Sequence, residues 1–270
     1  MESILERRII WKQTILSGNF QNGIKKLLDE NIINPSDASR KVEGLIFEAS
    51  TDPAITGLTV DAQFTGDNLY DAIKKLCDSK NIGFRIKLSD DNKFVFKLYA
   101  GTDRSYDQFT NPYVIFSPKF ENVINTNYLE SKKTLKTVTL VAGEGEGADR
   151  RTTTVACSSG AGTGLKRREL YTDARDVSST VDNETLTDAE YKAQLSQRGL
   201  ENLAENVLTK SFEGKVETTR MYRYGEDFFL GDMVQIVNEY GIEGKARVTE
   251  FIRSQSKEGL DSYPTFVTVE

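Results

Sequence analysis

The residues best placed for chemistry lie in segment 167–177, where acids and arginines alternate. The segment contains Glu169, Asp173, Asp176, Arg167, Arg168 and Arg175. Carboxylates grouped in this way could act as general acid and base in a hydrolase. Alternatively, they could pair with the arginines and fix a loop or a subunit contact. Nearby cations lower the pKa of a carboxyl group, which suits ion pairing better than general-acid work, so we favour the paired network.

The sequence contains no histidine. Histidine is the commonest general base near neutral pH and a leading metal ligand, so histidine triads and histidine-based zinc sites are excluded. Carboxylate, lysine and tyrosine chemistry remain. We expect no catalytic, cofactor-binding or metal-ligating residues, and therefore a protein that is not an enzyme and needs no cofactor.

A glycine cluster, Gly160–Gly164, precedes Leu165, Lys166 and Arg167. A phosphate-binding P-loop has more widely spaced glycines and a Ser or Thr after its Lys, and neither condition is met here. The dinucleotide-binding pattern also fails because no helix signal follows the cluster. We interpret the segment as a mobile surface loop.

Two further motifs could be mistaken for sites. Asp90, Asp91 and Asn92 suggest a calcium loop, but the glycine and final Glu of an EF-hand are missing, so we interpret them as a turn. Cys77 and Cys157 are far apart and match no metal or redox spacing, so we expect two buried, inert free thiols.

The first part of the chain shows two helical stripes and a hairpin. Helices are predicted at 19–30 and at 68–79, the second capped by Asp67. Residues 84–88 and 94–98 alternate between apolar and polar types on either side of a turn, which predicts a β-hairpin.

The second part is richer in strands. Residues 136–141 and 152–157 predict a long hairpin, and its acidic, glycine-rich tip spans Gly143–Gly147. Thr187 to Glu190 form a capping box that opens a helix at 188–208. The expected inner face of this helix consists of Leu200, Leu203, Ala204 and Val207, and Gly199 is expected to mark a close packing contact.

The stretch from Tyr222 to Ile236 looks like the closing strand pair of a barrel or sandwich, with a tight turn at Gly231 and Asp232. We therefore predict an α+β fold, in which β-barrel-like antiparallel strands join a helix-containing α/β subdomain and one long helix. The predicted domains are 1–110, an α/β subdomain with two helices and a hairpin, and 111–270, a barrel-like domain interrupted by helix 188–208. Trp11, the sole tryptophan, is interpreted as a core or interface anchor.

Composition describes a globular protein with 38% hydrophobic and 28% charged residues. No apolar run is long enough to span a membrane, and the start of the chain has no signal peptide, so we expect no membrane association and synthesis in the cytoplasm. The net charge of −6 argues against tight duplex binding.

Several stretches in the same order resemble the tail-hub (baseplate-hub) proteins of long-tailed phages and prophages. They are Leu5–Gln13, Val141–Arg151, Arg167–Asp176, Tyr222–Val234 and Tyr263–Phe266. Members of that family usually begin with a further β-rich stretch before the first of these segments. This chain starts almost on that segment, as expected of a trimmed chain or a late gene start, and its first barrel would then be incomplete.

The resemblance implies a structural role at the end of a tail tube, with no catalytic residues. It implies a homotrimer that contacts other tail proteins, assembles in the host cytoplasm and ends in the virion tail. DNA would pass without specific binding, and we expect Glu144, Glu146 or other carboxylates to face a lumen or a subunit seam. Two alternatives stay open: a module that binds carbohydrate or a host surface through exposed aromatics, and a cell-wall hydrolase with paired carboxyls about 5 to 10 Å apart.

Overall fold

The computed structural model describes residues 1–181, 184–216, 221–241, 243–257 and 259–269. Two compact units emerge, each built from two segments of the chain. Unit 1 consists of Met1–Tyr99 and Lys136–Val207, and unit 2 consists of Ala100–Leu135 and Leu208–Glu270. The domains predicted at 1–110 and 111–270 stay a prediction, which separate expression of the two pieces would test.

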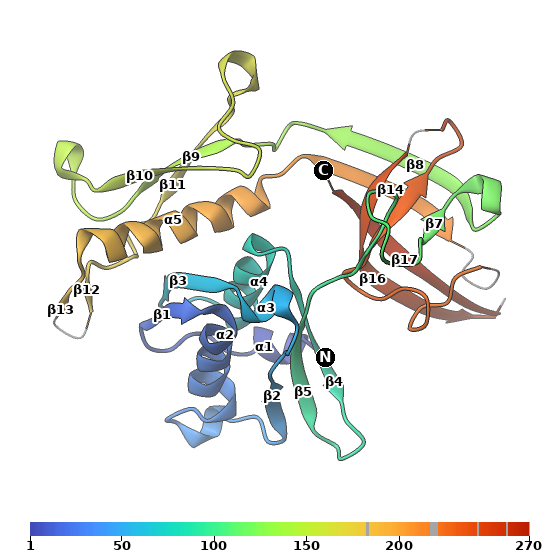
Figure 1. Ribbon diagram of the computed structural model, residues 1–270. Helices are drawn as coiled ribbons and strands as arrows, with labels where there is room; N and C mark the ends of the chain where they lie inside the picture. The colour runs from blue at the N-terminus through green and yellow to red at the C-terminus, as the bar shows by residue number, and fades with distance from the viewer. Residues whose placement is uncertain (182–183, 217–220, 242, 258, 270) are drawn as a thin grey trace. The chain divides into compact units, whose positions relative to one another are not determined.

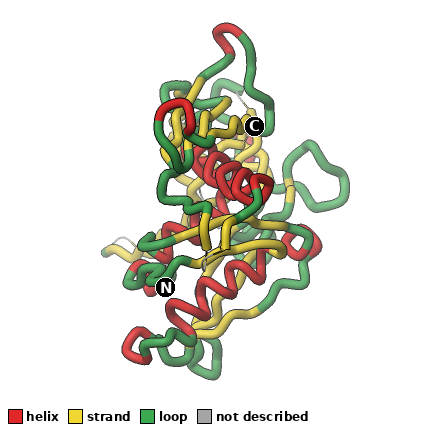
Figure 2. Tube along the Cα trace, turned by 90° about the vertical axis from the view of Figure 1, so that its left-hand side faces the viewer, coloured by secondary structure: helices red, strands yellow, loops and turns green. Residues whose placement is uncertain are grey.

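Helices and strands both contribute to the chain, and the predicted α+β class is confirmed (Figures 1 and 2). The helices of unit 1 are α1 (Ser3–Glu6), α2 (Phe20–Leu28), α3 (Pro53–Thr56), α4 (Leu69–Ser79) and α5 (Asp188–Glu205), with a π-helical turn at Asp29–Ile33. Shorter 3₁₀ turns lie at Ala38–Arg40, Gly147–Asp149 and Gly164–Lys166.

The strands of unit 1 form small sheets. They are β1 (Thr14–Asn19) with β3 (Thr59–Phe64), β2 (Leu45–Glu48) with β5 (Phe94–Tyr99) and β4 (Gly83–Leu88), β10 (Thr152–Ala156) with β9 (Val138–Ala142) and β11 (Glu169–Asp173), and β12 (Thr180–Val181) with β13 (Glu184–Thr185). The hairpins predicted from alternation at β4–β5 and at β9–β10 are both confirmed.

Local side-chain chemistry explains where the helices begin. Asn68, and not the predicted Asp67, caps α4, because its side-chain oxygen accepts from the backbone N–H of Tyr70. The Asp67 carboxylate instead accepts from the N–H of Thr65, two residues earlier. The capping box predicted for α5 is present, with Thr187 and Glu190 bonding each other's backbone N–H.

Helix α5 is covered on two sides, and this changes which of its residues are buried. One side packs on the β10–β9–β11 sheet, and another packs on β3 and α4 (Figure 1). Of the four predicted inner-face residues only Leu203 is buried, while the helix buries Tyr191, Gln194, Leu195, Gln197, Gly199, Glu201 and Leu203. The prediction was wrong because a one-sided apolar stripe describes a helix with a single packing face.

Gly199 lies where α5 approaches the sheet most closely. A Cβ at this position would lie 2.8 Å from the Cγ2 of Val141 and 2.9 Å from the Cγ2 of Val155. The close packing predicted at this glycine is therefore confirmed.

Unit 2 is organised around one sheet. Its strands are β6 (Asp103–Arg104), β7 (Ile115–Phe116), β8 (Val123–Ser131), β14 (Thr209–Val216), β15 (Met233–Val237), β16 (Glu243–Ser256) and β17 (Gly259–Val269), with a 3₁₀ turn at Pro118–Phe120. The order is β6-β15-β16-β17-β14-β8, and β7 also pairs with β15. Since β6 and β8 lie at opposite ends of this order, the described strands form an open sheet and not a closed barrel.

The stretch predicted as a closing strand pair supplies one strand and much of this unit's core. Gly231 has a φ of +89°, and the turn aims β15 as expected. The aromatic residues before the turn pack with the sheet: Phe228 is fully buried and lies edge-on to Phe116, with ring centroids 5.5 Å apart. Tyr224 stacks on Phe251 at 4.1 Å.

Candidate contact site in the charged loops

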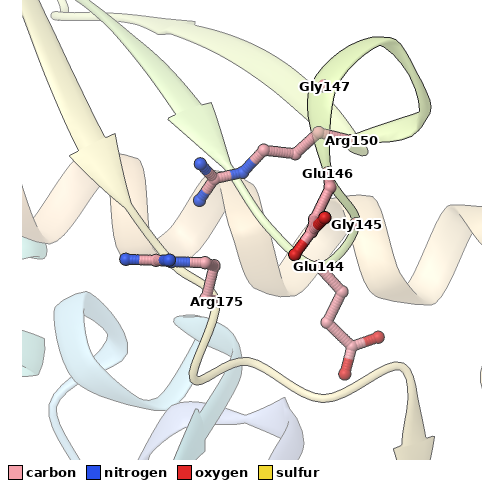
Figure 3. Close-up of a pocket in the computed structure, with 6 residues that line it drawn as sticks. All are labelled: Glu144, Gly145, Glu146, Gly147, Arg150 and Arg175. Atoms are coloured by element: carbon pink, nitrogen blue, oxygen red, sulfur yellow. The ribbon is translucent and has the colours of Figure 1, made fainter.

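A hollow of about 440 Å³ opens beside the tip of the β9–β10 hairpin (Figure 3). It is lined by Glu144, Gly145, Glu146, Gly147, Arg150 and Arg175. The tip folds back on itself at Gly145, whose φ is +104° and where a Cβ would lie 2.7 Å from the carbonyl oxygen of Asp149. Such a turn requires glycine, which explains why the loop is rich in this residue.

Arg150 ties the hairpin tip to β11. Its guanidinium group donates to the carbonyl oxygens of Gly143 (2.9 Å) and Ala142 (3.0 Å), to the Tyr171 hydroxyl (2.7 Å) and to Asp173 (2.7 Å). These bonds occupy donors on all three guanidinium nitrogens, so Arg150 is a structural clamp. Sequence reasoning missed it because its acidic partner lies 23 residues away along the chain.

Asp173 receives two arginines. Arg175 donates to both oxygens of this carboxylate, at 2.6 to 3.0 Å, and Arg150 donates to Oδ1 at 2.7 Å. The hydrogen bond from Arg175, followed by that from Arg150, lowers the pKa of Asp173 to about 2. The acid is therefore a permanent anion at neutral pH, which agrees with the paired network expected from the sequence.

The other acids of this segment are paired as well. Arg167 contacts Glu169 at 2.6 Å, and Asp176 contacts Arg198 of α5 at 2.9 Å. The predicted Arg–carboxylate interpretation is confirmed for these pairs. Arg198 lies outside the predicted segment, and only the packing of α5 brings it there.

Glu144 points away from the guanidinium groups of Arg150 and Arg175 (Figure 3). Its carboxylate accepts from the hydroxyl of Ser179 at 2.5 Å and lies 3.4 Å from Arg151. Partial burial raises the pKa of Glu144, but the hydrogen bonds from Ser179 and the charge of Arg151 outweigh it, and the net pKa is lowered.

Tyr191 of α5 holds this end of the loop in place. Its hydroxyl accepts from the backbone N–H of Glu144 at 2.8 Å and donates to the carbonyl oxygen of Val177 at 3.1 Å. The guanidinium group of Arg151 lies over its ring at 4.3 Å. The sequence signal for this role was weak, because a tyrosine on a helix is usually a packing residue.

Glu144, which lines the hollow, and Asp173, which contacts two of its arginines, have the pKa shifts of paired acids. A general acid needs a raised pKa, whereas the pKa values of Glu144 and Asp173 are both lowered. Burial does raise the pKa of Glu201 to about 7, but this side chain is buried in α5, 1% exposed, beside Gln197 and Arg198 and does not line the hollow. Within the part of the chain that the structure describes, no group of three or more acids and cysteines could hold a metal ion.

The remaining sequence motifs fall elsewhere. Residues 89–92 form the turn that was predicted, with Asn92 at a φ of +58° and its N–H bonded to the carbonyl oxygen of Ser89. The loop at Gly160–Gly164 leads to Leu165, whose side chain is fully exposed.

Both cysteines are free, as predicted. Cys77 is buried, and burial raises the pKa of its thiol. Cys157 is only half-buried, so its predicted burial was wrong; it follows the edge strand β10, and its sulfur contacts Ser159 and the carbonyl oxygen of Gly160.

Trp11 does not lie in the core, because 65% of its surface is exposed. The other interpretation of this residue, an interface anchor, stays a prediction. No helix in the described ranges combines the length and apolar character needed to cross a membrane.

The fold of this chain is similar to the folds of two prophage tail proteins. The 43 kDa tail protein of prophage MuSo2 from Shewanella oneidensis is similar over 98% of this chain and 71% of its own, with 11% identity and a TM-score of 0.52. The prophage tail protein gp18 from Listeria monocytogenes EGD-e is similar over 97% and 68%, with 15% identity and a TM-score of 0.50.

The sequence itself matches a family model over residues 1–266. The chain belongs to the Siphovirus ReqiPepy6 Gp37-like protein family. A search of the curated proteins finds no match.

Proposed function

We propose that this protein is a structural component of a phage or prophage tail tip, a tail or baseplate hub that assembles through protein–protein contacts at the end of the tail tube. The observation that carries the proposal is the fold: nearly the whole of this chain can be aligned with the structures of two prophage tail proteins. The charged loops support it, since their acids are neutralised in pairs, as in a surface built for contact.

The proposed assembly is a ring of identical copies, a trimer, that also binds other tail proteins. Carboxylates of the hairpin tip, such as Glu146, would face the lumen or a subunit seam. An acidic lumen repels phosphates, so DNA would pass without specific binding. Assembly would take place in the host cytoplasm, and the finished protein would stay in the virion tail without enzymatic activity.

Mass in solution tests the ring. Sedimentation velocity over a range of concentrations should show a species of three times the 30.3 kDa chain, and co-expression with the tail proteins encoded beside it should yield a complex that co-purifies. A monomer that binds none of those proteins would contradict the hub, and a monomer that cleaves cell-wall sugars would replace it with the hydrolase.

One surface favours a second candidate function, the binding of carbohydrate on a host surface. A loop of unit 2 exposes Tyr106, Phe109 and Tyr113, and Phe109 is 91% exposed. The side chain of Gln108 braces this loop by accepting from the N–H groups of Thr110 and Asn111. Glycan-array binding that is lost in Phe109→Ala would support this candidate, and an array without signal would remove it.

A further inference from the structure

The chain near its start presents two apolar side chains to solvent and hides the residue between them. Ile10 is fully buried, whereas Ile9 is 42% exposed and Trp11 is 65% exposed. This alternation follows from an extended backbone, which sends successive side chains to opposite sides. Ile9 and Trp11 therefore lie on the same exposed side of this segment.

Backbone bonds hold this segment firmly. The N–H of Ile10 donates to the carbonyl oxygen of Asp67 at 2.9 Å, and the carbonyl oxygen of Ile10 accepts from Gly66 at 2.8 Å. On either side, the carbonyl oxygen of Arg8 accepts from Leu69, and the N–H of Trp11 donates to Asn31. The two exposed side chains are thus presented by a fixed backbone, which lowers the entropy cost of binding.

Arg40 completes the surface. Its guanidinium group lies over the Trp11 ring at 5.1 Å and donates to the carbonyl oxygen of Ile9 at 2.6 Å. Arg8 in turn donates to the carbonyl oxygen of Arg40 at 2.8 Å. We call this surface, with the flanking cations of the same segment, the Trp11 patch: Arg7, Arg8, Ile9, Trp11, Lys12 and Arg40.

The cations of the Trp11 patch are not held in ion pairs. In the described residues, neither Arg40 nor the other three forms an ion pair with a carboxylate, in contrast to the arginines of the charged loops. Asp37 accepts from the N–H of Ser39, and the hydrogen bonds from Ser39, together with the charge of Arg40, lower the pKa of this carboxyl group. Glu6 is exposed at the end of α1. The Trp11 patch therefore combines two exposed apolar side chains with cations that form no ion pair in the described part of the chain.

We propose that the Trp11 patch is a docking surface for a second copy of this chain. Charge complementarity supports that occupant: the chain carries −6 in all, and removing the four cations of the patch leaves −10 for the rest. The rest of a second copy therefore carries a net negative charge, opposite in sign to the cations of the patch. Tryptophan and arginine are also the residues that most often dominate binding at interfaces. This inference rests on the proposed ring of copies, and it identifies the surface that one copy contributes to the contact with the next.

The sole tryptophan makes the test direct. Because Trp11 is the only one in the chain, all tryptophan emission reports on this patch. Emission spectra and sedimentation velocity are recorded on the full chain over the same concentration series, at low and high salt. We expect the emission to shift to shorter wavelength as the mass rises, with both changes weakened by salt.

Variants separate the patch from other surfaces. Trp11→Ala and Arg40→Ala should weaken association by about tenfold or more, as interface hot spots do. Tyr240→Ala, which removes an aromatic side chain of unit 2 that is 82% exposed, is the matched control and should associate as the natural chain does. Circular dichroism of each variant checks that a loss of association is not a loss of fold.

Each other outcome overturns the inference in a distinct way. Association with unshifted emission, or with undiminished affinity in Trp11→Ala, leaves the ring standing but moves its contact elsewhere. No association at any concentration contradicts both the ring and this docking surface. An emission shift that appears only when a poly-dT oligonucleotide is added would assign the Trp11 patch to nucleic acid.

Discussion

Asp173 shows how much one residue of this protein depends on its neighbours. It lies between two arginines that come from opposite directions along the chain, one from the β9–β10 hairpin and one from the turn after β11. Both partners favour the charged form, so this acid anchors loops and does not exchange protons near neutral pH.

Arg175→Ala should raise the pKa of Asp173 from about 2 toward its ordinary value of 3.8, because the strongest hydrogen bond to the carboxylate is lost. The change is read from the pH dependence of the carboxyl carbon shift in NMR spectra. Arg167→Ala is the matched control, since Arg167 pairs with Glu169 and should leave Asp173 unchanged. An Asp173 titration that stays in place in Arg175→Ala would contradict this account.

Glu201 gives the opposite pH dependence. Burial raises its pKa from 4.5 to about 7, so the folded state holds a proton that the unfolded state releases. The protein is therefore most stable, with respect to this group, below the unfolded-state pKa of 4.5. The free energy of unfolding falls as the pH rises from there through the folded-state pKa of about 7. At about 1.4 kcal/mol per pKa unit, this loss reaches roughly 3 kcal/mol.

Glu201→Gln removes this titration and should flatten the profile. The difference in the free energy of unfolding between the variant and the natural chain should grow between pH 4.5 and about 7, and it should level off above that pH. Urea unfolding at one-unit pH steps measures it. Glu205→Gln, at a half-exposed position of the same helix, is the control and should show the same pH dependence of stability as the natural chain. If the natural chain and Glu201→Gln lose stability in parallel with pH, Glu201 is not the group responsible.

At the scale of elements, α5 determines the arrangement of unit 1. It joins the β10–β9–β11 sheet on one side to β3 and α4 on another. A helix covered on two sides cannot keep all its polar residues in water, and α5 accordingly buries Gln194, Gln197 and Glu201. Such buried polar groups need partners, which Gln197 finds in Ser79 and Glu201.

Gly199→Val should destabilise the protein by about 2 to 3 kcal/mol. A Cβ already falls 2.8 Å from a methyl carbon of Val141, so the larger side chain forces the helix away from the sheet. Lys192→Val, at an exposed position of α5, is the control and should cost only about 0.5 kcal/mol through helix propensity. Chemical denaturation of both variants measures the difference, and equal costs would show that the close approach is unimportant.

The molecule as a whole carries more acid than base, and this bears on DNA. Its charge of −6 comes from 41 acids against 35 bases, and the bases of the charged loops are already paired. A protein binds duplex phosphate through clustered cations that displace counterions. The Trp11 patch is the exception to the overall charge, which is why a nucleic-acid oligomer belongs in its test.

We expect no measurable binding to duplex DNA at about 0.15 M salt, meaning a Kd weaker than about 10⁻⁴ M. Fluorescence anisotropy of a labelled duplex measures it, with a basic DNA-binding protein as positive control. A Kd of about 10⁻⁶ M or tighter would contradict a tube component past which DNA slides.

The sequence by itself determined the features that depend on neighbouring residues. The capping box at Thr187, the turn at residues 89–92, the two hairpins and the close contact at Gly199 could all be predicted. Local hydrogen bonds and alternation along a few residues are enough to specify such features. The pairing of acids with arginines in segment 167–177 was also foreseen, because opposite charges that are close in sequence remain close in space.

Only the tertiary structure decided which ion-pair partners are distant in sequence. Arg150 reaches Asp173, and Arg198 reaches Asp176, through packing that no local pattern encodes. The burial of Glu201, the exposure of Trp11 and the open edge of the unit 2 sheet were decided in the same way. Periodicity tells which side of an element is apolar, but burial depends on how many other elements cover it.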